Sequence, residues 1–168
     1  FAPNYHSAMK FVGPTRKKIG KRTIFNMIGP LSSPALVKKQ VIGVFDKKLL
    51  KIFANALKSL DIKFAWIVNS DDGLDEISIF APTNFYFIRG KNITKKKISH
   101  TKYKKYLSSK LNFKDIKGGI PSYNASRLIE LFQGKKDSYR DITIINSIYA
   151  MQTIKPAVSY THLTLPTM

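Results

Sequence analysis

The 168-residue sequence contains no cysteine, which excludes a disulfide framework and any thiolate metal site. An oxidising compartment is therefore not required, and we expect a cytoplasmic protein. No apolar run reaches the roughly 18 to 20 residues that a bilayer-spanning helix needs, and the start lacks the basic-then-apolar pattern of a signal peptide. We expect no attachment to a membrane.

Acidic residues are also scarce: ten Asp and Glu stand against 29 Lys and Arg, which gives a net charge of +19. Such a charge attracts polyanions. Only five of the basic residues are arginine, however, and arginine is the side chain preferred for bidentate phosphate and base recognition. The abundance of Lys, Ile, Asn, Phe and Tyr is typical of AT-rich codons. Base composition therefore explains the charge, and we do not expect a nucleic-acid partner.

Length and a 43% hydrophobic content indicate a globular chain with one compact unit. Gln40–Phe45 and Phe64–Val68 are apolar runs typical of buried strands, and Asp46 is a candidate N-cap for the amphipathic helix between them. Two strands around one helix form a βαβ unit with parallel strands, whose ligands gather at the carboxyl ends of the strands. The turn at residues 69–76 is expected there.

The remaining segments complete an α/β fold: a mostly parallel sheet flanked by helices. A first helix is expected within His6–Ile19, interrupted near Pro14, which cannot donate a backbone hydrogen bond. Shorter strands that can pair antiparallel and two later helices are predicted at Ile77–Phe80, Asn84–Ile88, Asn92–Ile98, Ser122–Gly134 and Asp141–Ile154. In the first late helix, Leu128, Ile129, Leu131 and Phe132 are expected to face inward.

The stretch RTIFNMIGPL, residues 22–31, combines an arginine and an Ile-Phe pair with Asn26, Gly29 and Pro30. Gly29 permits a close backbone approach and a positive φ, Pro30 fixes the exit direction, and Asn26 can bond the local main chain. The pattern is typical of a shaped, ligand-facing loop. It also suits a tight packing turn anchored in the core by Phe25 and Ile28, and the two interpretations are compatible.

Together with FAPNYHSAMK at residues 1–10, this stretch resembles the anthranilate phosphoribosyltransferases, with Ser7 where proline is commoner. The resemblance implies an α/β domain of the nucleoside phosphorylase and phosphoribosyltransferase type. It covers residues 1–157, which we interpret as a fragment that lacks the N-terminal helical region and the phosphate loop. Residues 158–168 do not resemble the family and are interpreted as a non-native tail.

For the acceptor, the resemblance implies that His6 and Arg16 lie beside anthranilate, that Arg16 contacts its carboxylate, and that Gly29 lines the same pocket. A guanidinium matches a planar carboxylate bidentately. Taken without the motif, a histidine that opens a helix is usually a cap or a surface group, and an arginine beside lysines is usually part of a solvated face.

The sequence DGLDE follows the second predicted strand and resembles the family's acidic pair near magnesium. The resemblance implies that Asp75 and Glu76 help hold Mg²⁺ against the diphosphate of phosphoribosyl pyrophosphate. By composition alone such a cluster is more often a turn. Four of the ten acidic residues nevertheless fall within six positions at a strand end, which favours a cation site.

The implied enzyme is a glycosyltransferase of the pentosyl class that acts in tryptophan biosynthesis. The amine of anthranilate attacks C1 of the ribose and diphosphate leaves, and positioning of the substrates supplies most of the acceleration. We therefore assign no catalytic base. We expect a homodimer for the complete enzyme and negligible turnover from this fragment alone.

Two alternatives remain at this stage. A pyrimidine nucleoside phosphorylase shares the architecture, although the Gly29-Pro30 loop and the acidic pair argue against it. A basic nucleic-acid-binding surface is the other, because lysines between residues 95 and 105 alternate with Tyr103 and Tyr106, which could stack on bases. A solvated, lysine-rich edge accounts for the same pattern.

Overall fold

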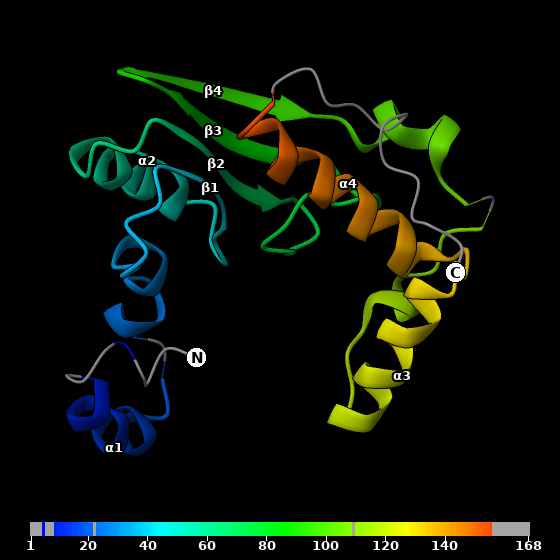
Figure 1. Ribbon diagram of the computed structural model, residues 1–168, viewed down its shortest axis with the longest axis horizontal. Helices are drawn as coiled ribbons and strands as arrows, with labels where there is room; N and C mark the ends of the chain where they lie inside the picture. The colour runs from blue at the N-terminus through cyan, green and yellow to red at the C-terminus, as the bar shows by residue number, and fades with distance from the viewer. Residues whose placement is uncertain (1–4, 6–8, 22, 109, 156–168) are drawn as a thin grey trace. The chain divides into compact units, whose positions relative to one another are not determined.

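The computed structural model describes residues 5, 9–21, 23–108 and 110–155, without the side chains of residues 9 and 10. The chain divides into two compact units, residues 1–37 and 38–168 (Figure 1). Each unit is described by itself below.

The first unit begins with helix α1, Met9–Ile19. Pro14 lies inside this helix, so the expected interruption there is wrong: a proline removes one backbone donor, and the helix continues around the missing bond. Two short 3-10 turns follow, η2 at Ile24–Asn26 and η3 at Gly29–Leu31.

The second unit is built on a four-stranded sheet in the order β1-β2-β3-β4. The strands are β1 Lys39–Gly43, β2 Phe64–Ser70, β3 Thr83–Arg89 and β4 Asn92–Ile98. β1 pairs parallel with β2, whereas β2 with β3 and β3 with β4 pair antiparallel. The α/β class and the parallel βαβ unit are confirmed, and the described sheet is mixed rather than mostly parallel because the later strands form hairpins.

The helices of this unit are α2 Leu49–Ser59, α3 Pro121–Phe132 and α4 Ser138–Gln152, with 3-10 turns η4 His100–Tyr106 and η5 Phe113–Ile116. α2 begins two residues later than an Asp46 cap would place it. The carboxylate of Asp46 instead accepts from the N–H of Lys48 at 2.8 Å, so it shapes the turn before the helix. None of the described helices has the length and apolar character needed to cross a membrane.

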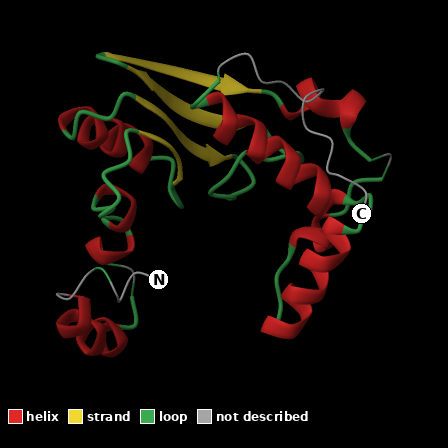
Figure 2. Cartoon of the chain, in the orientation of Figure 1, coloured by secondary structure: helices red, strands yellow, loops and turns green. Residues whose placement is uncertain are grey.

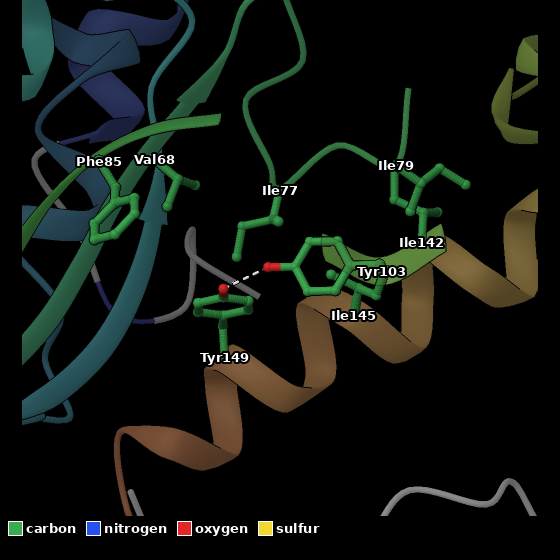
Figure 3. Packing of buried hydrophobic residues seen from close by; sticks show 8 residues of the cluster. All are labelled: Val68, Ile77, Ile79, Phe85, Tyr103, Ile142, Ile145 and Tyr149. Carbon is green, nitrogen blue, oxygen red and sulfur yellow. Dashed lines mark hydrogen bonds between the residues drawn. The ribbon is translucent and has the colours of Figure 1, made fainter. Parts of the chain in front are cut away.

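The sheet is covered by helices. Trp66 on β2 lies 5.1 Å, centroid to centroid, from Tyr149 on α4, and Val68 belongs to the same buried cluster as Tyr149. Ala65 and Ile67 alternate with these residues and are fully buried on the other face, and α2 contacts both β2 and β3. Figure 3 shows the α4 side, where the hydroxyls of Tyr103 and Tyr149 point toward each other and share a hydrogen bond.

Ile77–Phe80 was expected as a strand and is instead part of the loop between β2 and β3, drawn in green in Figure 2. The backbone of Ile77 is paired with a side chain: its N–H donates to Oδ1 of Asn146 on α4, and its carbonyl accepts from Nδ2, both at 2.9 Å. The N–H of Ser78 donates to side-chain oxygens as well, those of Ser70 and Thr83. Side chains thus replace the neighbouring strand that the apolar run would otherwise need.

The inward-facing set of α3 is also partly wrong. Leu131 is buried at 4% exposure, whereas Leu128, Ile129 and Phe132 are 44 to 57% exposed. The two ends of the helix match the sequence better. Pro121 is its first residue and Gly134 follows it with φ of +84°, in the left-handed region that favours glycine after a helix.

Candidate functional site

The acidic turn, residues 70–76, follows β2 and joins it to the loop that returns to β3. The N–H of Gly73 donates to the carbonyl of Ser70 at 3.0 Å, and that of Ser70 donates to the carbonyl of Leu74 at 2.9 Å. Gly73 has φ of +91°, which a residue with a side chain rarely adopts. The turn therefore begins where the sequence predicts it, at the carboxyl end of the second parallel strand.

Two serines hold this turn from inside the unit. The hydroxyl of Ser70 donates to the carbonyl of Glu76 at 2.6 Å and shares a second hydrogen bond of 2.7 Å with the hydroxyl of Thr83. The hydroxyl of Ser78 donates to the carboxylate of Asp72. Ser70, Ser78 and Thr83 are each at most 2% exposed, and the bond between Ser70 and Thr83 is shielded from water.

Gly43, the last residue of β1, lies directly against the turn. A Cβ placed on Gly43 would be 1.6 Å from the carbonyl oxygen of Asp75 and 2.7 Å from its carbonyl carbon. No side chain fits there without moving the backbone of Asp75. Because Gly43 has no side chain, the backbone of Asp75, a predicted magnesium ligand, can lie against the end of the parallel strand pair.

The four acidic residues of the turn divide by their partners. Asp71 contacts Lys97 at 2.8 Å and Lys47 at 3.5 Å, and Nδ2 of Asn84 donates to it at 2.6 Å. The hydrogen bond from Lys97, followed by that from Asn84, lowers the pKa of Asp71. Asp71 is thus an ionised, neutralised anchor between the turn and β4.

Asp72, Asp75 and Glu76 make up the rest of the acidic turn's charge. Burial raises the pKa of the Glu76 carboxyl, and the negative charges of Asp75 and Asp72 raise it further. The turn therefore holds carboxylates whose charges repel one another, a situation that a bound cation relieves.

The carboxylates of the acidic turn suit a magnesium ion that is shared with substrate phosphates, rather than a metal ion held by protein ligands alone. Across the described residues, no group of three or more His, Cys, Asp or Glu side chains is placed to hold a metal ion. Mg²⁺ usually keeps several waters and binds through one or two carboxylates together with phosphates of the substrate. The predicted pair, Asp75 and Glu76, with a diphosphate as the remaining ligand, matches that mode.

The predicted acceptor-binding residues belong to the first unit. His6 lies outside the described residues. Arg16 is on α1, half-buried, and its carbonyl accepts from the N–H of Gly20 at 3.2 Å. The structure thus places Arg16 and Gly29 in one unit and the acidic pair in the other.

The Gly-Pro loop, defined here as residues 23–32, has the local bracing that its sequence predicts. Oδ1 of Asn26 accepts from the N–H of Thr23 at 2.9 Å, and the hydroxyl of Ser32 donates to the carbonyl of Ile28 at 2.9 Å. Gly29 opens η3 with Pro30 next, but its φ is not positive, so the expected left-handed geometry is wrong. No residue of η2 or η3 is buried, so the expected core anchors, Phe25 and Ile28, are only half-buried.

A Cβ placed on Gly29 would meet no atom of the described residues within 4 Å. Glycine is therefore not required there by packing within the unit. A requirement from outside it, such as a ligand that approaches the backbone, is the alternative reason for a glycine at this position.

In the lysine and tyrosine segment, Tyr103 is not available to stack on a base. Tyr103 is buried at 6% exposure and its hydroxyl is bonded to that of Tyr149. Lys105 lies over the ring of Tyr106, with its Nζ 4.7 Å from the centroid. The alternation of lysine and tyrosine reflects one core residue beside solvated lysines.

Sequence reasoning did not identify the residues that hold the acidic turn. Gly43 is an ordinary strand glycine by sequence, Ser70 lies in the predicted turn, and Ser78 lies in the segment that the sequence predicts as a strand. Nothing in the sequence signals that the amide of Asn146 bonds the loop 69 positions earlier. Pairing across such distances cannot be inferred from one sequence.

The family profile "Glycosyl transferase family, a/b domain" matches residues 1–162. Anthranilate phosphoribosyltransferase from Pelagibacter ubique (strain HTCC1062) is 58% identical over 148 residues, which is 88% of this chain and 44% of that protein. The enzyme of the same name from Afipia carboxidovorans is 43% identical over 147 residues, 88% of this chain and 43% of that protein. The chain thus spans less than half the length of these relatives.

Solved structures agree on the fold. Anthranilate phosphoribosyltransferase from Saccharomyces cerevisiae in complex with 4-fluoroanthranilate superposes with a TM-score of 0.80 at 22% identity, over 96% of this chain and 46% of that one. The same yeast enzyme in complex with PRPP and Mg gives 0.77 at 21% identity, over 94% and 45% of the two chains. With the family profile, these matches establish that the chain belongs to the glycosyl transferase family, a/b domain, and that it is similar to anthranilate phosphoribosyltransferases.

Proposed function

We propose that the complete protein transfers the phosphoribosyl group of phosphoribosyl pyrophosphate to the amine of anthranilate, in tryptophan biosynthesis. The observation that carries the proposal is the acidic turn: a set of carboxylates at the carboxyl end of a parallel strand, where burial and mutual repulsion raise the pKa of Glu76. The names of the relatives that match residues across this chain point to the same reaction.

In this proposal Asp75 and Glu76 hold Mg²⁺ against the diphosphate. The bound ion supplies charge neutralisation as the leaving group departs. The chain's own contribution is to fix the two carboxylates: Gly43 admits the backbone of Asp75, and Ser70 bonds the carbonyl of Glu76.

The acceptor is assigned to the first unit. Arg16 binds the anthranilate carboxylate through its guanidinium, with His6 and Gly29 beside the ring. The amine then attacks C1 of the ribose: a nitrogen to carbon bond forms, the bond from C1 to the diphosphate oxygen breaks, and the nitrogen releases a proton to water. A neutral aromatic amine is already nucleophilic, so no side chain is assigned as general base.

The quaternary and cellular assignments belong to the same proposal: a homodimeric, cytoplasmic enzyme. Residues 1–157 are proposed as part of the phosphoribosyltransferase α/β domain. The 158–168 tail stays a prediction, because those residues lie outside the described ones. The chain covers 44% of the length of the Pelagibacter ubique relative, to which it is 58% identical. We therefore expect negligible turnover from this chain by itself.

The test is a steady-state assay of the protein expressed from its complete reading frame, with both substrates and Mg²⁺. Arg16→Ala is expected to raise KM for anthranilate by about 100-fold, about 3 kcal/mol for a lost charge-assisted pair, and to leave KM for phosphoribosyl pyrophosphate unchanged. Asp75→Asn with Glu76→Gln is expected to show the converse and to raise the Mg²⁺ requirement. Phosphorolysis of thymidine, with no turnover of anthranilate, would instead identify a pyrimidine nucleoside phosphorylase.

A further inference from the structure

We propose that Asn146, on helix α4, is a positioning residue that sets the orientation of the acidic pair Asp75 and Glu76. The inference rests on the proposed function, since it concerns the same magnesium-holding turn. It adds a residue 70 and 71 positions away from the pair in the sequence, on a different element, to the set that shapes the site.

Both ends of the Asn146 amide are hydrogen-bonded. Its Oδ1 accepts from the N–H of Ile77, while its Nδ2 donates to the carbonyls of Ile77 and Ile142 at 2.9 and 3.0 Å. Two of these three bonds leave the helix. Only a side chain that carries both an acceptor and a donor at one end can bond both groups of Ile77 in this way.

The bond to the N–H of Ile77 acts on the peptide unit that joins Glu76 to Ile77. The carbonyl of that same unit, which belongs to Glu76, accepts from the hydroxyl of Ser70 at 2.6 Å. Both polar groups of one peptide plane are therefore held by side chains from opposite directions in the chain, β2 and α4. Because a peptide is planar, fixing both groups fixes the plane and with it the backbone from which the Glu76 side chain departs.

Burial makes this arrangement rigid. Ile77 is 0% exposed and packs in the same cluster as Ile142, Ile145 and Tyr149 of α4 (Figure 3). Water does not readily replace the amide of Asn146 at such a place, so an apolar substitute leaves two backbone groups unpaired. The peptide between Glu76 and Ile77 would then be free to shift, and the Glu76 side chain would lose its fixed direction of departure.

Neighbouring residues on α4 show that this role is particular to Asn146. The hydroxyl of Ser147 donates to the carbonyl of Thr143 at 2.8 Å, and that of Thr143 donates to the carbonyl of Tyr139 at 2.7 Å. Both bonds stay inside the helix. Ser147→Ala therefore removes a side-chain hydrogen bond from the same element without touching the acidic turn, and it is the matched control.

The experiment uses the protein expressed from its complete reading frame, with diphosphate present and Mn²⁺ as a paramagnetic stand-in for Mg²⁺. Three quantities are measured on each variant: the Mn²⁺ dissociation constant by electron paramagnetic resonance, the hydrogen exchange of the Ile77 amide by NMR, and the urea midpoint. Asn146→Leu is expected to weaken Mn²⁺ binding about 10-fold and to speed Ile77 exchange at least 10-fold. Ser147→Ala is expected to change neither.

Asn146→Ala serves as a second variant in case the leucine variant does not fold, because the smaller side chain fits the buried space without strain and still leaves the two backbone groups of Ile77 unpaired. If Asn146 has a purely structural role, the folded Asn146 variants keep the wild-type affinity for Mn²⁺ and only their urea midpoints fall. That result overturns the inference.

The double variant Asp75→Asn with Glu76→Gln separates this inference from the proposed function. If the double variant abolishes Mn²⁺ binding and the substitutions of Asn146 do not weaken it, the proposed metal site stands and the proposed role of Asn146 is wrong. If the double variant leaves Mn²⁺ binding intact, the metal role of the acidic turn is wrong, and the inference falls with it.

Discussion

The Gly-Pro loop and the acidic turn, the two segments in which the sequence predicts ligand contacts, take their shapes from different sources. In the Gly-Pro loop, the side-chain bonds of Asn26 and Ser32 reach backbone groups three and four residues away. In and beside the acidic turn, Ser70 bonds Thr83 across 13 residues, and Asn146 bonds Ile77 across 69. One region is braced by its own sequence and the other by the fold of its unit.

The difference indicates how each region responds when packing is loosened. A loop held by local bonds keeps its conformation as long as its own residues are intact, whereas a turn held by distant elements opens with the contacts between them. Substrate positioning and metal positioning would thus depend on different parts of the chain.

The comparison is tested most strongly by paired glycine variants. Gly43→Ala is expected to lower the free energy of unfolding by about 3 kcal/mol, because its Cβ would lie 1.6 Å from the carbonyl oxygen of Asp75. Gly29→Ala meets no described atom within 4 Å, and we expect a change below about 0.5 kcal/mol. The fluorescence of the single tryptophan, Trp66, follows the urea unfolding of the Gly43 variant. Circular dichroism follows the urea unfolding of both variants. Equal losses would contradict the division.

A second test removes one hydroxyl. Ser70→Ala loses the bonds to Glu76, Thr83 and the N–H of Ser78, and we expect a loss of about 2 kcal/mol for groups left unpaired in a buried place. Ser59→Ala is its control, since that hydroxyl only bonds Asn55 within an exposed helix turn. Urea midpoints of the two variants that coincide would count against a special role for Ser70.

The local region calls for a smaller change. Asn26→Ala removes the acceptor for the N–H of Thr23, and we expect about 1 kcal/mol of local destabilisation, the usual cost of losing such a cap. Amide exchange measured by NMR should become faster at Thr23 and stay unchanged at Ile77. Faster exchange at both amides would show that the two regions are coupled.

The smallest expected effect concerns charge. Burial, together with the charges of Asp75 and Asp72, raises the pKa of Glu76 above its value in the unfolded chain. The stabilising contribution of this group is then complete below the ordinary glutamate pKa of about 4.3 and is lost as the pH rises through the folded value. Glu76→Gln should therefore raise the urea midpoint at pH 7, and the gain should shrink toward pH 4.

A urea midpoint of Glu76→Gln that is lower than that of the wild type at pH 7 would contradict this sign. Mg²⁺ offers a further check: millimolar concentrations should raise the midpoint of the wild type more than that of the variant, because the ion stabilises only the state that binds it.

Much of the fold follows from the spacing of apolar residues and from the positions of turn-forming residues in the sequence. β4 has the predicted bounds, Asn92–Ile98, and β2 extends the predicted run by two residues. β2 is dense in β-prone residues, and Gly90, whose φ is +58°, supplies the turn between β3 and β4. Ile77–Phe80 has the same composition, but its backbone partners come from α4 and β2, which one sequence does not reveal.

The candidate site divides in the same way. The concentration of carboxylates at residues 71–76 and the local bond of Asn26 could be predicted, because both depend on neighbours in the chain. The neutralisation of Asp71 by Lys97 could not, since it requires the register in which Asn84 stands opposite Lys97. The exposed apolar side chains of α3 could not be predicted either, because periodicity tells which residues share a face and not what covers it.

The two edges of the sheet differ in a way that bears on self-association. β4 carries Lys95, Lys96 and Lys97 along an exposed edge, where like charges repel an approaching strand. In the part of the chain that the structure describes, β1 pairs only with β2, and its Val41 and Ile42 are apolar. A strand that approached the described sheet would therefore meet less charge repulsion at β1 than at β4, so the lysines bias any lengthening of the sheet toward the β1 side.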